Sequence, residues 1–249
     1  MVTPQASQKT WHCGADLKRH QNRIANPFLA AKERGLVDAV VQRAPANTRD
    51  VLDLGCGEGS GLGFLRQRLP HAAFTGVDFS FAKVRHMARA YPETSAVCAD
   101  ATRLPFGQES FDLVMLRDLL HHVDFARETV VAEAWRVLRP GGVLAILETD
   151  GRHPLNRIFR LLVPVERGMA NSTPLQLRAL LAPHGPCRLD HVEPSLGLRA
   201  VGFVLGWPSG FGRLPARLIY GAVWSWERLM AAAWPRTLWP GMLLTVAKE

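Results

Sequence analysis

The sequence is poor in residues and segments that mark particular classes of protein. Its four cysteines lie far apart and form no CxxC pair, which excludes a disulfide framework and a zinc site. No charge-free apolar run reaches the roughly 18 residues of a membrane-spanning helix. Residues 1–20 lack the apolar core of a signal peptide. We therefore expect a cytoplasmic protein, and peripheral contact with a membrane stays open.

Lysine is scarce although the chain is basic. The formal net charge is +8, and the basic residues are mostly arginine, spread from Arg19 to Arg236 without a dense run. Nucleic-acid binding is not favoured by that distribution, whereas an acidic surface such as a membrane remains an alternative.

Short aliphatic runs alternate with helical patterns from residue 49 onward. With 249 residues and 47% hydrophobic content the chain can bury one full core. Strands separated by helices predict βαβ units and a parallel sheet. Asp124 is a candidate N-cap for the helix that follows it. The strands are expected at 50–55, 72–78, 95–100, 111–118, 141–149, 187–194 and 241–249.

The stretch VLDLGCGEGSG, residues 51–61, places three alternating glycines directly after the first expected strand. Gly55, Gly57 and Gly59 permit a tight turn that leaves no side chain between the backbone and a ligand. The register is GxGxG rather than GxGxxG, and no GK[ST] of a P-loop follows. Asp53, two residues before the first glycine, suits a cationic ligand rather than a phosphate.

These residues resemble the first signature of the class I S-adenosylmethionine-dependent methyltransferases, and the chain looks like a small-molecule, type 11-like member. The later segments GVDFS, CADATRLPF, FDLVMLRDLLHHVD and VLRPGGVLAILE resemble the following signatures in order. The resemblance covers about residues 48–150 and the last strand. It implies an α/β fold, a doubly wound, seven-stranded, mostly parallel Rossmann-like sheet with a helical apolar insertion before the last strand.

The resemblance also implies a domain division. Residues 1–47 would form an N-terminal helical lid and 48–249 the methyltransferase domain. Within that domain, 48–150 would bind the cofactor, while 151–185 and 197–239 would be substrate or lid insertions.

The cofactor implied is S-adenosyl-L-methionine, and the resemblance implies the residues that would hold it. Asp78 would accept both ribose hydroxyls, and Asp100 would accept from the adenine amino group. Ala101 would offer its backbone N–H, with Phe79 and Leu104 lining the ring. The cofactor-binding residues expected are Asp53, Gly55, Cys56, Gly57, Gly59, Asp78, Phe79, Asp100, Ala101 and Arg117, and no metal is expected.

Methyl transfer needs an aligned nucleophile and, for an alcohol or phenol, a base. His121 and His122 follow the fourth strand, and histidine titrates near neutrality. Either is a candidate base, or a structural part of the cofactor site. Glu148, after the fifth strand, is a third candidate. Arg117 would meet the cofactor carboxylate or the substrate, or form a surface pair with Asp118.

The acceptor expected is a small hydrophobic molecule such as a lipid, isoprenoid, aromatic or polyketide-like compound, with O-methylation slightly favoured. C- or N-methylation, and cofactor binding without methyl transfer, are the alternatives. A nucleic-acid methyltransferase is disfavoured because RDLL, residues 117–120, replaces the Asn/Asp-Pro-Pro-aromatic tetrapeptide of the amino-methylating types.

The segment 214–234 has an unusually broad apolar face at helical spacing. It would complete the core, line a pocket for an apolar substrate, or contact a membrane surface or a second copy of the chain. The residues on that face are Leu218, Ile219, Ala222, Val223, Trp226, Leu229, Met230, Ala233 and Trp234.

Overall fold

The computed structural model describes residues 20, 23–193 and 216–249. One seven-stranded sheet organises them, in the order β3-β2-β1-β4-β5-β7-β6. All neighbouring strands are parallel except the pairs made by β7, which runs antiparallel to β5 and β6. The strands are β1 Asp50–Leu54, β2 Ala73–Asp78, β3 Ser95–Cys98, β4 Phe111–Arg117, β5 Leu138–Thr149, β6 Arg188–Val192 and β7 Gly241–Ala247.

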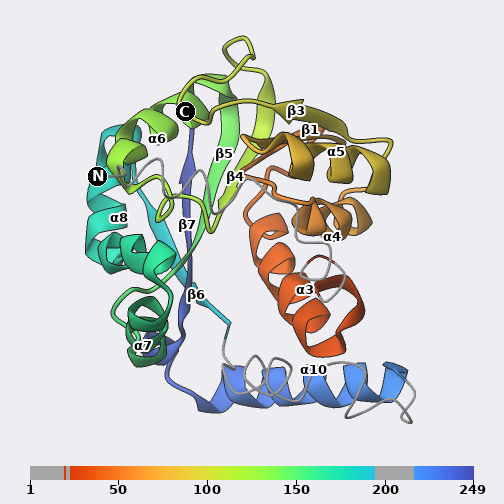
Figure 1. Ribbon diagram of the computed structural model, residues 1–249, viewed down its shortest axis with the longest axis vertical. Helices are drawn as coiled ribbons and strands as arrows, with labels where there is room; N and C mark the ends of the chain where they lie inside the picture. The colour runs from red at the N-terminus through yellow and green to blue at the C-terminus, as the bar shows by residue number, and fades with distance from the viewer. Residues whose placement is uncertain (1–19, 21–22, 194–215) are drawn as a thin grey trace.

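Helices cover both faces of this sheet (Figure 1). The α-helices are α3 Pro27–Val41, α4 Ser60–Arg68, α5 Phe81–Ala90, α6 Arg127–Val137, α7 Pro154–Leu162, α8 Pro174–Leu181 and α10 Ala216–Ala233. The 3-10 helices are η1 Asp124–Ala126, η2 Pro164–Asn171, η3 Ala182–His184 and η4 Arg236–Leu238. The doubly wound architecture predicted from the sequence is confirmed.

Alternation along each strand divides the core into two layers, because successive side chains point to opposite faces of a sheet. Val51, Leu113 and Met115 pack with α3, α4 and α5 on one face. Leu52 and Val114 pack with α6 and α8 on the other. The same parity decides which face each polar side chain at the strand ends occupies.

The expected strands and most of the expected helices are present, but the N-cap prediction was wrong. Asp124 begins the 3-10 helix η1, and α6 starts only at Arg127, without a side-chain cap. Asp124 instead pairs with Arg127 at 2.8 Å and accepts from Asn171 at 2.7 Å. A 3-10 turn and an ion pair thus occupy the place where the cap was expected.

Of the expected N-terminal segment, residues 1–47, the structure describes residue 20 and residues 23–47. Within it, α3 buries Ala30, Leu36, Val37 and Val40 against the sheet. Residues 1–19, 21–22 and 194–215, and hence the first part of the expected 197–239 insertion, lie outside the described residues.

The described part of that insertion is α10, which packs against α3 and lies at one end of the molecule (Figure 1). Leu218, Trp226, Leu229 and Trp234 from its broad apolar face are 45–60% exposed. These four side chains therefore do not contribute to the core. No described helix is long and apolar enough to cross a bilayer.

Candidate functional site

The glycine-rich turn joins the buried end of β1 to α4. Gly55, Gly57 and Gly59 all have φ between +56° and +83°, a left-handed conformation that side chains disfavour. A Cβ on Gly59 would also lie 2.5 Å from Met87. The Oδ2 atom of Asp78, at the end of β2, accepts from the Gly57 N–H at 3.0 Å and holds the turn in place.

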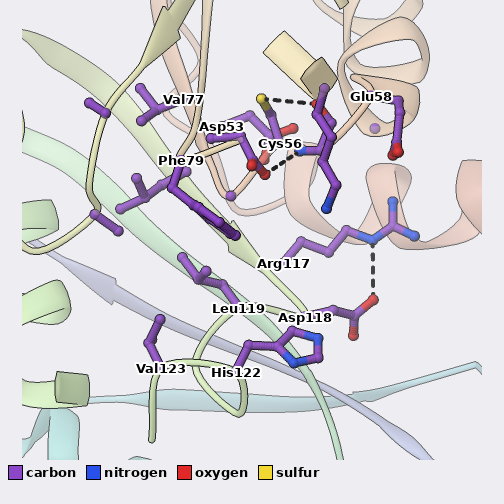
Figure 2. A pocket seen from close by; sticks show the side chains of 18 of the residues that line it. Asp53, Cys56, Glu58, Val77, Phe79, Arg117, Asp118, Leu119, His122 and Val123 are labelled. Carbon is purple, nitrogen blue, oxygen red and sulfur yellow. Dashed lines mark hydrogen bonds and ion pairs between the residues drawn. The ribbon is translucent and has the colours of Figure 1, made fainter. Parts of the chain in front are cut away.

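A cavity lies beside this turn, where the carboxyl ends of β1 and β4 meet. The chain winds from β1 toward β2 on one side and from β4 toward β5 on the other, and such a switch point is where open α/β sheets bind ligands. Figure 2 shows Asp53, Phe79, Arg117 and His122 gathered around it. The expected site residues that line it are Asp53, Gly55, Cys56, Gly57, Asp78, Phe79, Asp100, Ala101, Arg117 and His122.

Asp53 is almost completely buried at the floor of this cavity. No group of the described residues donates a hydrogen bond to its Oδ1 atom. Burial raises the pKa of Asp53 to about 7, against the attraction of Arg117 and with the repulsion of Asp78. A buried carboxylate with unsatisfied bonding capacity is suited to a cation that enters the cavity.

Two other carboxylates reach the same cavity from the ends of β2 and β3. Burial raises the pKa of Asp78, whose Oδ1 also accepts from the Ser80 N–H at 2.9 Å. Asp100 is exposed, and its Oδ1 accepts from the backbone N–H and the hydroxyl of Thr102 at 2.9 and 2.8 Å. Hydrogen bonds thus hold both oxygens of Asp78 and one oxygen of Asp100, and both carboxylates line the cavity.

The remaining residues of the expected cofactor set differ in their surroundings. Phe79 is partly exposed at the cavity wall, and Cys56 is buried there, which raises the pKa of its thiol. Gly59 and Leu104 are not among the lining residues: Gly59 packs on Met87, and Leu104 is buried in the α6 and α8 layer.

Arg117 is buried and forms a bidentate ion pair with Glu33 of α3, in which Nη2 lies 2.6 Å from Oε1. Burial opposes the charge on Glu33, but Arg117 outweighs it and lowers the pKa of Glu33 to about 2. Asp118 is a weaker partner of Arg117, at 3.9 Å. The guanidinium thus faces the cavity while bound to the helix above it, and the pairing with Asp118 considered from the sequence is secondary.

The other two candidate bases, His121 and Glu148, lie next to the cavity but outside its lining, with the ring of His121 4.0 Å from the ring of His122. His121 is buried with its Nδ1 2.6 Å from Glu148 and its Nε2 3.2 Å from Glu166. Burial disfavours the imidazolium, but Glu148 outweighs this effect and the pKa of His121 is raised to about 10. Glu148 also accepts from the Leu120 N–H at 2.7 Å. Neither residue lines the cavity, whereas His122 does.

Several residues at the site were not singled out from the sequence. Arg23, Glu58 and Lys83 also line the cavity. Glu33 carries a detectable signal, because it falls on the apolar stripe of its helix, four residues after Leu29 and four before Val37. Arg127 carries none, yet it donates to carbonyls at Leu120, Gly168 and Asn171 and ties α6 to η2.

Comparison with known proteins agrees with this geometry. The methyltransferase domain family matches residues 52–146. A demethylmenaquinone methyltransferase of Roseiflexus castenholzii is 36% identical over 181 residues, covering 66% of this chain and 74% of that protein. A phthiotriol/phenolphthiotriol dimycocerosates methyltransferase of Mycobacterium ulcerans is 41% identical over 111 residues, 43% of this chain. This chain therefore spans about two-fifths, 39%, of the length of that relative.

Solved structures show the same fold. The plantazolicin methyltransferase BpumL, in complex with S-adenosylhomocysteine, superimposes with a TM-score of 0.63 at 13% identity, over 99% of this chain and 95% of that one. A Haemonchus contortus phosphoethanolamine N-methyltransferase has a TM-score of 0.57 at 21% identity, over 86% of this chain and 52% of that one.

The doubly wound sheet, the left-handed glycine turn and the aspartates at the strand ends define a nucleoside-binding α/β protein. The chain belongs to the S-adenosylmethionine-dependent methyltransferases.

Proposed function

We propose that this chain transfers a methyl group from S-adenosylmethionine to a small hydrophobic acceptor. The observation that carries the proposal is the convergence of Asp53, Asp78 and Asp100 with the glycine turn on one cavity at the switch point. The proposal fits the family and the positions of the three carboxylates.

The residues present fit this cofactor. Asp53 would face its positive charge, and Asp78 would accept from the ribose hydroxyls. Asp100 and Ala101 would bind the adenine edge, with Phe79 against the ring. When bound, the cofactor supplies an electrophilic methyl group, and the protein aligns the acceptor and excludes water.

We assign the role of general base to His122, because it lines the cavity whereas His121 is held between two glutamates. His122 would accept the proton of an acceptor hydroxyl, which favours O-methylation. The hydrophobic acceptor class is supported by the relatives named for phthiotriol dimycocerosates and demethylmenaquinone. Methylation of carbon or nitrogen on a similar acceptor is the second candidate.

The test has two stages. Calorimetry with S-adenosylmethionine measures binding, and incubation with methyl-deuterated cofactor and a panel of hydrophobic phenols, alcohols and quinols measures transfer by mass spectrometry. Binding followed by a labelled product is the expected result. Binding without product across the panel would favour a protein that binds the cofactor without transferring it, and absence of binding would refute both.

The His122→Ala variant tests the base. We expect turnover to fall by about 10²-fold with cofactor affinity retained, since a general base typically contributes 10²–10⁴-fold. His71→Ala is the matched control, because His71 is an exposed histidine that is not among the lining residues. Near-normal turnover of His122→Ala on a hydroxyl acceptor would remove His122 from the mechanism.

A further inference from the structure

The apolar face of helix α7 is exposed to solvent. Its apolar residues Leu155, Ile158, Phe159, Leu161 and Leu162 are 45–80% exposed. They fall on one face at helical spacing, a pattern that normally packs against a core.

The polar face of α7 is the one that contacts the protein. Asn156 is buried, and its Nδ2 donates to the Asp150 carbonyl at 2.8 Å and to the Pro240 carbonyl at 3.3 Å. The Nη1 of Arg160 donates to the Gly151 carbonyl at 3.2 Å. These hydrogen bonds fix the orientation of the helix about its own axis. A small rotation of α7 therefore could not bury its apolar face.

Helix α10 adds a second exposed surface of similar chemistry. Trp226 and, one residue beyond the helix, Trp234 belong to its broad apolar face and are 45% and 49% exposed, while Trp224, on the opposite side of the helix, is 59% exposed. The Arg228 guanidinium lies 4.6 Å from the centre of the Trp224 ring. Tryptophan and arginine together suit the boundary between water and lipid, where an apolar ring and a polar group are both accommodated.

The two helices lie at the same end of the molecule (Figure 1). They are joined through the chain that follows α10: Trp239 donates to the Trp234 carbonyl at 3.2 Å, and Pro240 accepts from Asn156 of α7. The exposed apolar side chains of both helices therefore belong to one end of the protein.

The positive charge at this end of the molecule favours an anionic partner. Helix α7 contains Arg157 and Arg160 and no acidic residue, and α10 contains Arg217 and Arg228 against the single acid Glu227. The whole chain carries +8. Two copies of so basic a surface would repel each other, whereas anionic lipid headgroups would attract it.

We propose that α7 and α10 form a docking surface for an anionic lipid bilayer. Their apolar side chains enter the headgroup region while the arginines meet the lipid phosphates. Neither helix spans the bilayer, in keeping with the length and hydropathy of the described helices. This inference does not depend on the proposed methyl transfer, because binding is measured without cofactor or acceptor.

The test is co-sedimentation of the full chain with vesicles of phosphatidylcholine alone and of phosphatidylcholine mixed with phosphatidylglycerol. We expect binding to the anionic vesicles, a blue shift of tryptophan emission, and weakening in high salt. The variants Ile158→Ser with Leu162→Ser, and Trp226→Ser with Leu229→Ser, should each lose about tenfold or more in vesicle affinity. Arg157→Gln with Arg228→Gln should weaken binding to anionic vesicles.

The matched control is Leu175→Ser, because Leu175 is 79% exposed on α8, outside the proposed surface. It should bind vesicles like the parent protein. Absence of binding to anionic vesicles, or equal binding by all variants, would overturn the proposal. So would a dimer in sedimentation velocity that the serine variants abolish, because the partner would then be a second copy of the chain.

Discussion

Asp53 combines burial with a role that requires charge. A carboxyl with a pKa of about 7 is only partly ionised at neutral pH, and the sulfonium of the proposed cofactor favours its ionised form. Cofactor binding should therefore release a proton from Asp53, and the affinity for S-adenosylmethionine should rise with pH through about 7.

Calorimetry between pH 6 and pH 8 in buffers of different ionisation enthalpy checks this prediction. S-Adenosylhomocysteine, whose sulfur is neutral, should show a smaller pH dependence than S-adenosylmethionine. The Asp53→Asn variant should bind more weakly and lose the pH dependence near 7. An affinity that does not change with pH in the parent protein would contradict the assignment of Asp53 to the cation.

At the scale of elements, the ion pair of Arg117 with Glu33 holds α3 over the cavity. Breaking a buried pair leaves an uncompensated charge and typically costs about 3–5 kcal/mol. Glu33→Gln should lower the free energy of unfolding by that order, and hydrogen exchange in α3 should increase. Urea denaturation measures the first effect and exchange mass spectrometry the second.

The same helix offers a control. Asp38 pairs with Arg68 at the surface, with both side chains 41% exposed, so Asp38→Asn should cost about 1 kcal/mol or less. The double variant Glu33→Leu with Arg117→Met should be more stable than Glu33→Gln alone, because no buried charge is left unpaired. If Glu33→Gln cost no more than Asp38→Asn, the pair would not hold the helix.

The elements were predictable from the sequence because strand and helix periods are local signals. The partners of the polar side chains were not, because they depend on which face each strand end presents. Asp53 and Arg117 share the parity of Val51 and Met115 and so face α3, where Glu33 lies. Glu148 has the opposite parity and so meets His121 beneath α6 and α8.

The cavity-lining residues near the glycine turn were predictable because the glycines and the aspartate of this ligand-binding motif stand at fixed distances from one another in the sequence. The orientation of α7 was not predictable, since its apolar periodicity indicates a buried face. The tertiary hydrogen bonds of Asn156 and Arg160 hold that face outward.

At the scale of the whole molecule, Asp53 and His121 are buried groups whose raised pKa values make stability fall as pH rises. The pKa of Asp53 is raised from 3.8 to about 7, so its ionisation costs stability progressively across that range. The pKa of His121 is raised from 6.5 to about 10, so its contribution is complete below 6.5 and is lost as pH rises toward about 10. The pKa of Glu33 is lowered, so acid below about 4.5 removes stability instead.

The free energy of unfolding should therefore contain one decline with pH from Asp53, between about pH 4 and pH 7, and another from His121, between pH 6.5 and about pH 10. Denaturation curves across pH 3 to 10 check this, and two variants separate the causes. Asp53→Asn should flatten the decline between pH 4 and pH 7, and His121→Gln the decline between pH 6.5 and pH 10. If either variant left its own decline unchanged, the assignment of that decline to Asp53 or to His121 would be wrong.

Strand parity sends Asp53 and Glu148 to opposite faces of the sheet, but their surroundings meet at the strand ends, where the ring of His121 lies 4.0 Å from the ring of His122. Because Glu166 of η2 holds His121 from its other side, a change in η2 also reaches the proposed base. Engineers who alter η2 to admit a new acceptor should therefore expect the turnover to change together with the choice of acceptor.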